Sequence, residues 1–305
     1  MISLAQIDYI LALKEHQNFQ KAASHCFVTQ PTLSMQLKKA EEQLGNTIFD
    51  RDKTPIALTF FGETILPHLF AIKDGYEALS NQIKKLEGSY KAELRIGIIP
   101  TVAAYLVPDL YSSWQETLMD IKLEIVELKS EILIEQLNDR KIDFGIMAGP
   151  LTLPKIVEQI LFHEEITVFA PEVKSSLTFE KLETMQPWLL AQGNCLRTQM
   201  INFCSINEEN KKTWNYEGGS IQLLLEMVNQ QGGYTLVPKN YIPYTKIEAD
   251  KFHHFKEKKP VRQIIGIYNE RSSKIAYIEK IIRTIQRNKS SQELTVNQSN
   301  ILPWK

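Results

Sequence analysis

Seven apolar residues between positions 65 and 86 alternate at spacings of four and three, and this pattern constrains the fold more than any other feature of the chain. They are Ile65, Leu69, Ile72, Tyr76, Leu79, Ile83 and Leu86. Such spacing places all of them on one seam of a single long helix, as in a coiled coil. Residues 60–88 are therefore predicted to form a linker helix through which two chains dimerise. The alternative is a helix that packs only against its own domain.

The residues before this helix predict a small helical domain with a two-stranded wing. Apolar periodicity predicts helices over 4–15, 19–26 and 30–44. Pro31 suits the start of the third helix, and Gly45 suits its end. The tight junction between the second and third helices is typical of a helix-turn-helix. With wing strands at 48–51 and 56–59, residues 1–59 are expected to form a winged helix-turn-helix domain.

The third helix carries amide and hydroxyl side chains at its N-terminal end, where a recognition helix meets base edges in the major groove. Gln, Ser and Thr can hydrogen-bond bases, whereas Lys and Arg contact phosphates. The candidate DNA-contacting residues are Thr29, Gln30, Thr32, Ser34, Gln36, Lys38, Lys39, Arg51 and Lys53. Residues 1–90 hold nine basic and ten acidic side chains, so net charge does not support DNA binding. A solvated helix face remains the alternative.

Beyond residue 90, strands alternate with helices, a pattern typical of α/β domains with a parallel sheet. The predicted strands are 94–99, 122–127, 144–147, 166–170, 188–191, 212–216, 234–237 and 264–268. Two lobes joined by crossing strands are expected, with a cleft for a small ligand between them. Residues 91–163 and 267–305 would form lobe I, and residues 164–266 lobe II.

Two of the three cysteines, Cys195 and Cys204, lie in a segment predicted to be helical. Nine residues of helix rise about 13.5 Å and turn through about 900°, which puts the two thiols on opposite faces. A disulfide needs Cα atoms within about 7 Å, so the pair can join only if the helix unwinds. This geometry indicates a candidate redox switch. Two buried small hydrophobic side chains are the alternative.

The chain has no apolar run of about 18 residues, so no membrane span is expected. Its first residues break their apolar pattern too often for a signal peptide. A reducing cytoplasm is the expected location, where thiol pairs are more often redox-active or inert than structural. The six histidines show no metal-ligand spacing, and neither a metal nor a cofactor is expected.

Four N-terminal motifs closely resemble the signature of LysR-type transcriptional regulators. They are Phe19-Gln-Lys-Ala-Ala, the run from Thr29 to Gly45, Ile48-Phe-Asp-Arg and Leu58-Thr-Phe-Phe-Gly. The resemblance implies a winged helix-turn-helix, a linker helix and a two-lobed effector domain like a periplasmic binding protein. It also implies a homodimer or homotetramer on double-stranded promoter DNA, with RNA polymerase as a partner and no enzymatic activity.

Within that family, residues 193–204 and 99–108 resemble the peroxide-sensing OxyR branch. The resemblance makes Cys195 the peroxidatic cysteine and Cys204 the resolving cysteine. Hydrogen peroxide would be the effector, and a cellular thiol would reduce the disulfide. The implied peroxide pocket comprises Thr101, Ser130, Asn194 and Arg262. Ser130 stands where Thr is usual and keeps the hydroxyl, whereas Asn194 stands where His is common and cannot titrate.

The thiolate is the species that reacts with peroxide. Asn194 is predicted to cap a helix whose first turn holds Cys195, where the helix dipole favours negative charge. Arg197 and Thr198 are expected to stabilise the thiolate, and the thiol pKa is expected to fall. Oxidation to a sulfenic acid and then a disulfide would close a loop of about ten residues, worth roughly 2–3 kcal/mol before native-state strain is subtracted. That balance suits a reversible bond.

Two other functions compete with a peroxide-responsive regulator. One is a LysR-type regulator that senses a small metabolite between its lobes and has an incidental cysteine pair. The other is a thiol peroxidase, which is disfavoured because an enzyme needs neither a recognition helix nor a dimer seam.

Overall fold

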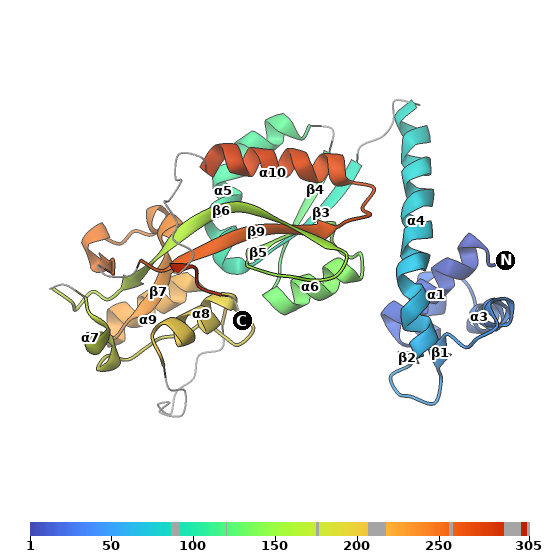
Figure 1. The fold of residues 1–305 in the computed structure, drawn as a ribbon, viewed down its shortest axis with the longest axis horizontal. Helices are drawn as coiled ribbons and strands as arrows, with labels where there is room; N and C mark the ends of the chain where they lie inside the picture. Colours follow the sequence, from blue (N-terminus) through green and yellow to red (C-terminus); the bar gives the residue numbers. More distant parts are fainter. Residues whose placement is uncertain are drawn as a thin grey trace. The chain divides into compact units, whose positions relative to one another are not determined.

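In the computed structural model, the chain divides into two compact units, residues 1–90 and residues 91–305, which are described separately (Figure 1). The structure describes residues 1–86, 92–119, 121–174, 177–206, 218–255, 259–289 and 300–303. The predicted strand at 212–216 lies outside these ranges. No helix in the described ranges is both long and apolar enough to cross a membrane.

The first unit contains the predicted three helices and wing. They are α1 (Leu4–His16), α2 (Phe19–His25), α3 (Gln30–Leu44), and the antiparallel strands β1 (Phe49–Asp50) and β2 (Ala57–Leu58). A capping box between Ser3 and Gln6 starts α1. The Oγ1 of Thr29 accepts the backbone N–H of Thr32 at the start of α3, which ends where Gly45 takes φ +75°. These local signals explain why the helix boundaries are readable from the sequence.

The carboxylate of Glu41 joins α3 to the wing. Its Oε1 accepts backbone N–H groups of Ile48 at 2.8 Å and Phe49 at 3.3 Å. Its Oε2 accepts from Arg51 Nη2 at 2.7 Å. Because Ile48 and Phe49 are buried together with Glu41, their backbone N–H groups have no ready replacement acceptor in water.

Replacing Glu41 with alanine is expected to lower the free energy of unfolding of this unit by about 2 kcal/mol, since buried donors to a charged acceptor lose their partner. Hydrogen exchange of the unit's amides across a urea series would measure the change. Glu42→Ala, at the adjacent exposed position, is the control and should change stability by less than about 0.5 kcal/mol. Equal losses in both variants would contradict this role.

The predicted linker is a single helix, α4 (Phe60–Leu86). Its first turn packs closely on the wing, since a Cβ added to Gly62 would lie 2.3 Å from the carbonyl oxygen of Ile48. Only part of the predicted seam is available for pairing. Ile65 and Leu69 pack into the core of their own unit, because they lie where α4 crosses it. The exposed apolar side chains of the predicted seam are Ile72, Tyr76, Leu79, Ile83 and Leu86.

The second unit is built on a seven-stranded sheet in the order β4-β3-β5-β9-β6-β7, with β8 paired to β6. Its strands are β3 (Ala92–Ile98), β4 (Ile121–Glu127), β5 (Phe144–Ala148), β6 (Ile156–Phe169), β7 (Thr235–Pro238), β8 (Phe252–His253) and β9 (Val261–Asn269). The sheet is mixed rather than parallel as predicted. Strand β3 pairs in parallel with β4 and β5, whereas β6, β7 and β9 pair antiparallel. Residues 188–191 form no strand, and only an isolated bridge joins Pro187 to Tyr234.

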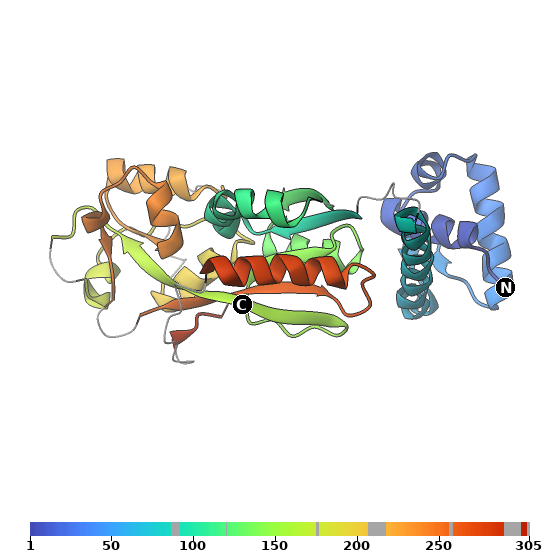
Figure 2. The ribbon, with the colours of Figure 1, turned by 90° about the horizontal axis from the view of Figure 1, so that it is seen from above.

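Strands β6 and β9 run side by side through both halves of this unit (Figures 1 and 2). The helices of the unit are α5 (Pro100–Thr117), α6 (Ser130–Asn138), α7 (Phe179–Glu183), α8 (Cys195–Phe203), α9 (Ile221–Gln231) and α10 (Ile275–Lys289), with 3-10 helices η2 (Lys239–Tyr244) and η3 (Ala249–Lys251). Ile301 pairs in parallel with Val261 at the start of β9. This part of the range assigned to lobe I therefore lies against a residue assigned to lobe II.

Candidate functional site: a buried thiol and guanidinium

Four residues far apart in the sequence come together inside the second unit. Thr101 is in the first turn of α5, Ser130 begins α6, Cys195 begins α8 and Arg262 is the second residue of β9. Their exposed fractions are 1%, 2%, 3% and 0%. Three helix N-termini thus contribute to the site, and their dipoles favour negative charge there.

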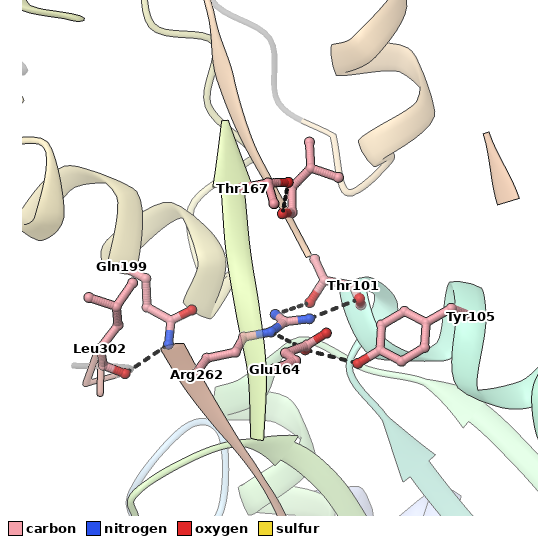
Figure 3. Close-up of polar contacts among 8 residues, drawn as sticks. Thr101, Tyr105, Glu164, Thr167, Gln199, Arg262 and Leu302 are labelled. Atoms are coloured by element: carbon pink, nitrogen blue, oxygen red, sulfur yellow. Dashed lines mark hydrogen bonds and ion pairs between the residues drawn. The ribbon is translucent and has the colours of Figure 1, made fainter. Parts of the chain in front are cut away.

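The guanidinium of Arg262 is held by hydrogen bonds on two sides (Figure 3). Its Nη1 donates to Thr101 Oγ1 at 3.0 Å, and its Nη2 donates to the Thr101 carbonyl oxygen at 3.1 Å. Its Nε donates to Glu164 Oε1, which also accepts from the Tyr105 hydroxyl at 2.8 Å. Thr101 and Arg262 were predicted from the sequence, whereas Glu164 and Tyr105 were not. The available signal was the presence of Glu164 within the mostly apolar segment 160–170. A carboxylate buried in such a strand needs a hydrogen-bond or charged partner, so its position indicates a buried polar contact.

Burial raises the pKa of the Cys195 thiol above its ordinary value. Arg262, the Ser130 hydroxyl and the backbone of Leu196 and Ala148 act in the opposite direction but do not outweigh burial. The expectation of a lowered pKa is therefore wrong for this state, because the thiol lies in a low-dielectric interior that disfavours its charged form. The Ser130 hydroxyl lies beside the thiol, and its Oγ is buried without a hydrogen-bond partner of ordinary geometry within the described residues.

Arg197 and Thr198 do not have the expected position at the thiol. The Nη1 of Arg197 donates to the carbonyl oxygen of Leu190 at 2.9 Å, and both residues lie on the half-buried side of α8. The side chains that act to lower the pKa of Cys195 include Arg262 and Ser130. Spacing along a helix could not reveal this, since the charge that matters comes from β9.

Asn194 occupies the predicted N-cap position of α8, but its side chain makes no capping hydrogen bond. Its Nδ2 instead donates to the carbonyl oxygen of Ala191 at 2.9 Å. Asn194 is buried beside Cys195 in the chain. An amide at this position brings polarity to the site without a titratable charge.

Cys204 lies at the other end of α8 as its C-terminal cap, and both cysteines are free thiols. Burial raises the pKa of Cys204 to about 12, although a hydrogen bond with the Tyr234 hydroxyl opposes the rise. The continuous helix between the two cysteines agrees with the predicted separation. Tyr234 was not identified from the sequence, because nothing local links residues 204 and 234.

A buried hydrogen bond also connects the middle of helix α8 to the C-terminal segment of the chain. Gln199 is fully buried, and its Nε2 donates to the carbonyl oxygen of Leu302 at 3.0 Å (Figure 3). The backbone N–H of Leu302 donates to the carbonyl oxygen of Val261 at 2.8 Å, directly before Arg262. Unwinding α8 would therefore break the hydrogen bond between Gln199 and Leu302, and Leu302 is itself hydrogen-bonded to the first residue of β9.

The candidate DNA-contacting residues of the first unit fall into three groups. Three are exposed, namely Gln30, Lys38 and Lys39. Others also have roles within the fold. Gln36 Oε1 accepts from Gln6 Nε2 at 3.2 Å, and Arg51 pairs with Glu41. The remaining candidates are Thr29, Thr32 and Ser34 around the first turns of α3, and Lys53, whose Nζ lies 3.7 Å from Asp50 Oδ2.

Comparison with known proteins gives two family matches that together cover most of the chain. Residues 4–63 match the bacterial regulatory helix-turn-helix protein, lysR family, and residues 87–288 match the LysR substrate binding domain. Among curated relatives, the hydrogen peroxide-inducible genes activator of Haemophilus influenzae is 29% identical, over 78% of this chain and 80% of the relative. The HTH-type transcriptional regulator EstR of Acinetobacter baylyi is also 29% identical, with the same coverage.

Solved structures show the same architecture. A full-length OxyR variant from Pseudomonas aeruginosa superposes with a TM-score of 0.73 at 26% identity, covering 94% of this chain and 95% of that chain. A peroxide-bound mutant of Corynebacterium glutamicum OxyR gives a TM-score of 0.60 at 28% identity, covering 98% of each chain.

Proposed function

This chain belongs to the LysR family of bacterial transcriptional regulators, and from that premise we propose that it senses hydrogen peroxide through Cys195 and Cys204. The family consists of DNA-binding regulators rather than enzymes, which excludes the thiol peroxidase alternative. Winged helix-turn-helix units would bind promoter DNA, and the exposed apolar residues of α4 between 72 and 86 would pair two chains. Further pairing to a tetramer and contact with RNA polymerase complete the proposal.

The observation that carries this function is a buried thiol surrounded by groups suited to a very small polar ligand. The Ser130 hydroxyl and the Arg262 guanidinium lie at Cys195, and the Thr101 hydroxyl accepts a hydrogen bond from that guanidinium. Hydroxyls can donate and accept, and a guanidinium donates only, so together they can bind both oxygens of a peroxide. Exposed fractions of 3% or less favour peroxide over a larger metabolite.

The chemistry needs both cysteines. The Cys195 thiolate attacks one peroxide oxygen, the O–O bond breaks, and the leaving hydroxide takes up the thiol proton to become water. The Cys204 thiolate then attacks the sulfur of the sulfenic acid and expels hydroxide, which takes up the proton lost by the Cys204 thiol to become a second water, and a disulfide is left. Because Cys204 lies beside Tyr234 at the far end of α8, it must leave that site first. A cellular thiol would reduce the bond and restore the helix.

Mass spectrometry after brief treatment with one equivalent of peroxide tests this proposal. A Cys195–Cys204 cross-link is expected, and DNA footprints of reduced and oxidised protein should differ. Cys26→Ser is the control, because Cys26 caps α2 in the other unit and should not change the result. Absence of the cross-link, with a footprint that responds only to a metabolite, would favour the metabolite-sensing alternative.

A further inference from the structure

Glu164 is a buried carboxylate that the proposed peroxide chemistry does not use directly. It is 2% exposed, and it lies directly opposite Arg262 in the antiparallel pairing of β6 with β9. Its Oε1 accepts from Arg262 Nε and from the Tyr105 hydroxyl. Its Oε2 has no hydrogen-bond partner among the described residues. We propose that Glu164 is a positioning residue that orients Arg262 and, by neutralising its charge, keeps Cys195 in the thiol form.

The orienting role follows from the shape of the guanidinium. This group is planar and rigid, so fixing its Nε on one side and its two Nη atoms on the other fixes the whole plane. Glu164 supplies the first contact, and Thr101 supplies the other two. The remaining Nη hydrogens are then held in one direction. Arg262 therefore acts on the Cys195 thiol as a positive charge in a fixed place rather than as a mobile side chain.

The neutralising role follows from the charges that face this site. Arg262 of β9 is paired with Glu164 of β6, and Lys289 of α10 is paired with Asp109 of α5 at 2.5 Å. Tyr105 is uncharged, because burial raises the pKa of its hydroxyl. Asn194 adds no charge. Among the described groups, the site is therefore neutral while Cys195 is a thiol and carries an unbalanced negative charge once it ionises.

An unbalanced charge in a buried site is costly, so Glu164 raises the free energy of the thiolate. Glutamine at this position can still accept hydrogen bonds from Arg262 and Tyr105, but it carries no charge. The charge of Arg262 would then be balanced by the thiolate itself. The inference rests on the proposed function only in treating Cys195 as the reactive thiol.

The test is the pH dependence of Cys195 alkylation by iodoacetamide in Glu164→Gln, followed by mass spectrometry between about pH 5 and about pH 10. The midpoint should fall by about one pH unit or more, the usual effect of one neighbouring charge, giving about tenfold more thiolate below the midpoint. Glu165→Gln is the matched control. Glu165 points to the other face of β6, where it contacts Lys239 and His254. The midpoint of Cys195 alkylation should therefore be the same in Glu165→Gln as in the unmodified protein. An unchanged midpoint in Glu164→Gln overturns the proposal.

If Glu164→Gln does not fold, the same interaction can be measured in the opposite direction, as the effect of residue 195 on the pKa of Glu164. Linkage requires that a negative charge at position 195 raise the pKa of Glu164 as much as Glu164 raises that of the thiol. Carbon-13 NMR titration of labelled glutamate should give a higher pKa for Glu164 in Cys195→Asp than in Cys195→Ser. Equal values overturn the proposal.

Peroxide kinetics separate this inference from the proposed function. A lowered alkylation midpoint with no reaction of Cys195 with peroxide would support the role of Glu164 and remove peroxide sensing. Normal peroxide-driven cross-linking with an unchanged midpoint would leave the sensing function and remove the role of Glu164.

Discussion

Replacing Cys195 with serine is expected to abolish the peroxide response while leaving DNA binding unchanged. Serine has nearly the same volume as cysteine and can be accommodated in the buried site, but its hydroxyl does not attack a peroxide oxygen. The DNA-binding helix belongs to a separate compact unit, so its fold should not depend on residue 195. Promoter activation with and without peroxide, together with footprinting of the purified variant, would measure both effects.

The companion variant Cys204→Ser distinguishes the two thiols. It should still react with peroxide at Cys195 but should stop at the sulfenic acid, which dimedone would trap. Cys26→Ser should behave like the unmodified protein. A Cys195→Ser variant that still activates its promoter on peroxide addition would refute the proposed mechanism.

Replacing Arg262 with methionine is expected to lower the free energy of unfolding by about 3–5 kcal/mol. Removing one partner of a buried ion pair leaves the other as an uncompensated charge. Here that charge is Glu164, which has an exposed fraction of 2% and can relax toward water only if the fold opens. The variant should also react more slowly with peroxide, because the positive charge that lowers the pKa of Cys195 is lost.

The loss of stability in Arg262→Met should depend on pH with a definite sign. Burial raises the pKa of Glu164, and without Arg262 only the Tyr105 hydrogen bond and Lys289 oppose that rise. A carboxyl whose folded pKa exceeds its unfolded value binds protons more tightly when folded, so stability falls as pH rises between the two values. The deficit measured by urea denaturation should be larger at pH 8 than at pH 5. Arg283→Met, which breaks an exposed pair with Glu279, should cost less than about 0.5 kcal/mol at either pH.

Local signals in the sequence determine much of the fold. The bounds predicted for the third helix, residues 30–44, agree with the structure, because Pro31 and Gly45 act within one turn of each end. Residues 188–191 show the limit of the same reasoning. Their apolar character predicts a strand, but the backbone N–H of Trp188 donates to Tyr234 and that of Ala191 to Gly218, so no ladder forms.

The candidate site was predictable where the resemblance supplied positions, and less so where burial or register decides the chemistry. The resemblance placed Thr101, Ser130 and Arg262 in one predicted pocket, and the three residues do lie together in the structure. The pairing of Glu164 with Arg262 depends on the register of β6 against β9, which is a tertiary property. The direction of the Cys195 pKa shift depends on burial, and a one-dimensional pattern does not report it.

The hydrogen bond between Gln199 and Leu302 bears on the redox potential of the proposed Cys195–Cys204 couple. If α8 unwinds when the disulfide forms, the oxidised protein loses this contact, and a net hydrogen bond is worth about 1 kcal/mol. Stabilising the dithiol by that amount makes the couple more oxidising by roughly 20 mV. The contact would therefore help ordinary cellular thiols to reduce the disulfide and would set how much peroxide is needed to keep it formed.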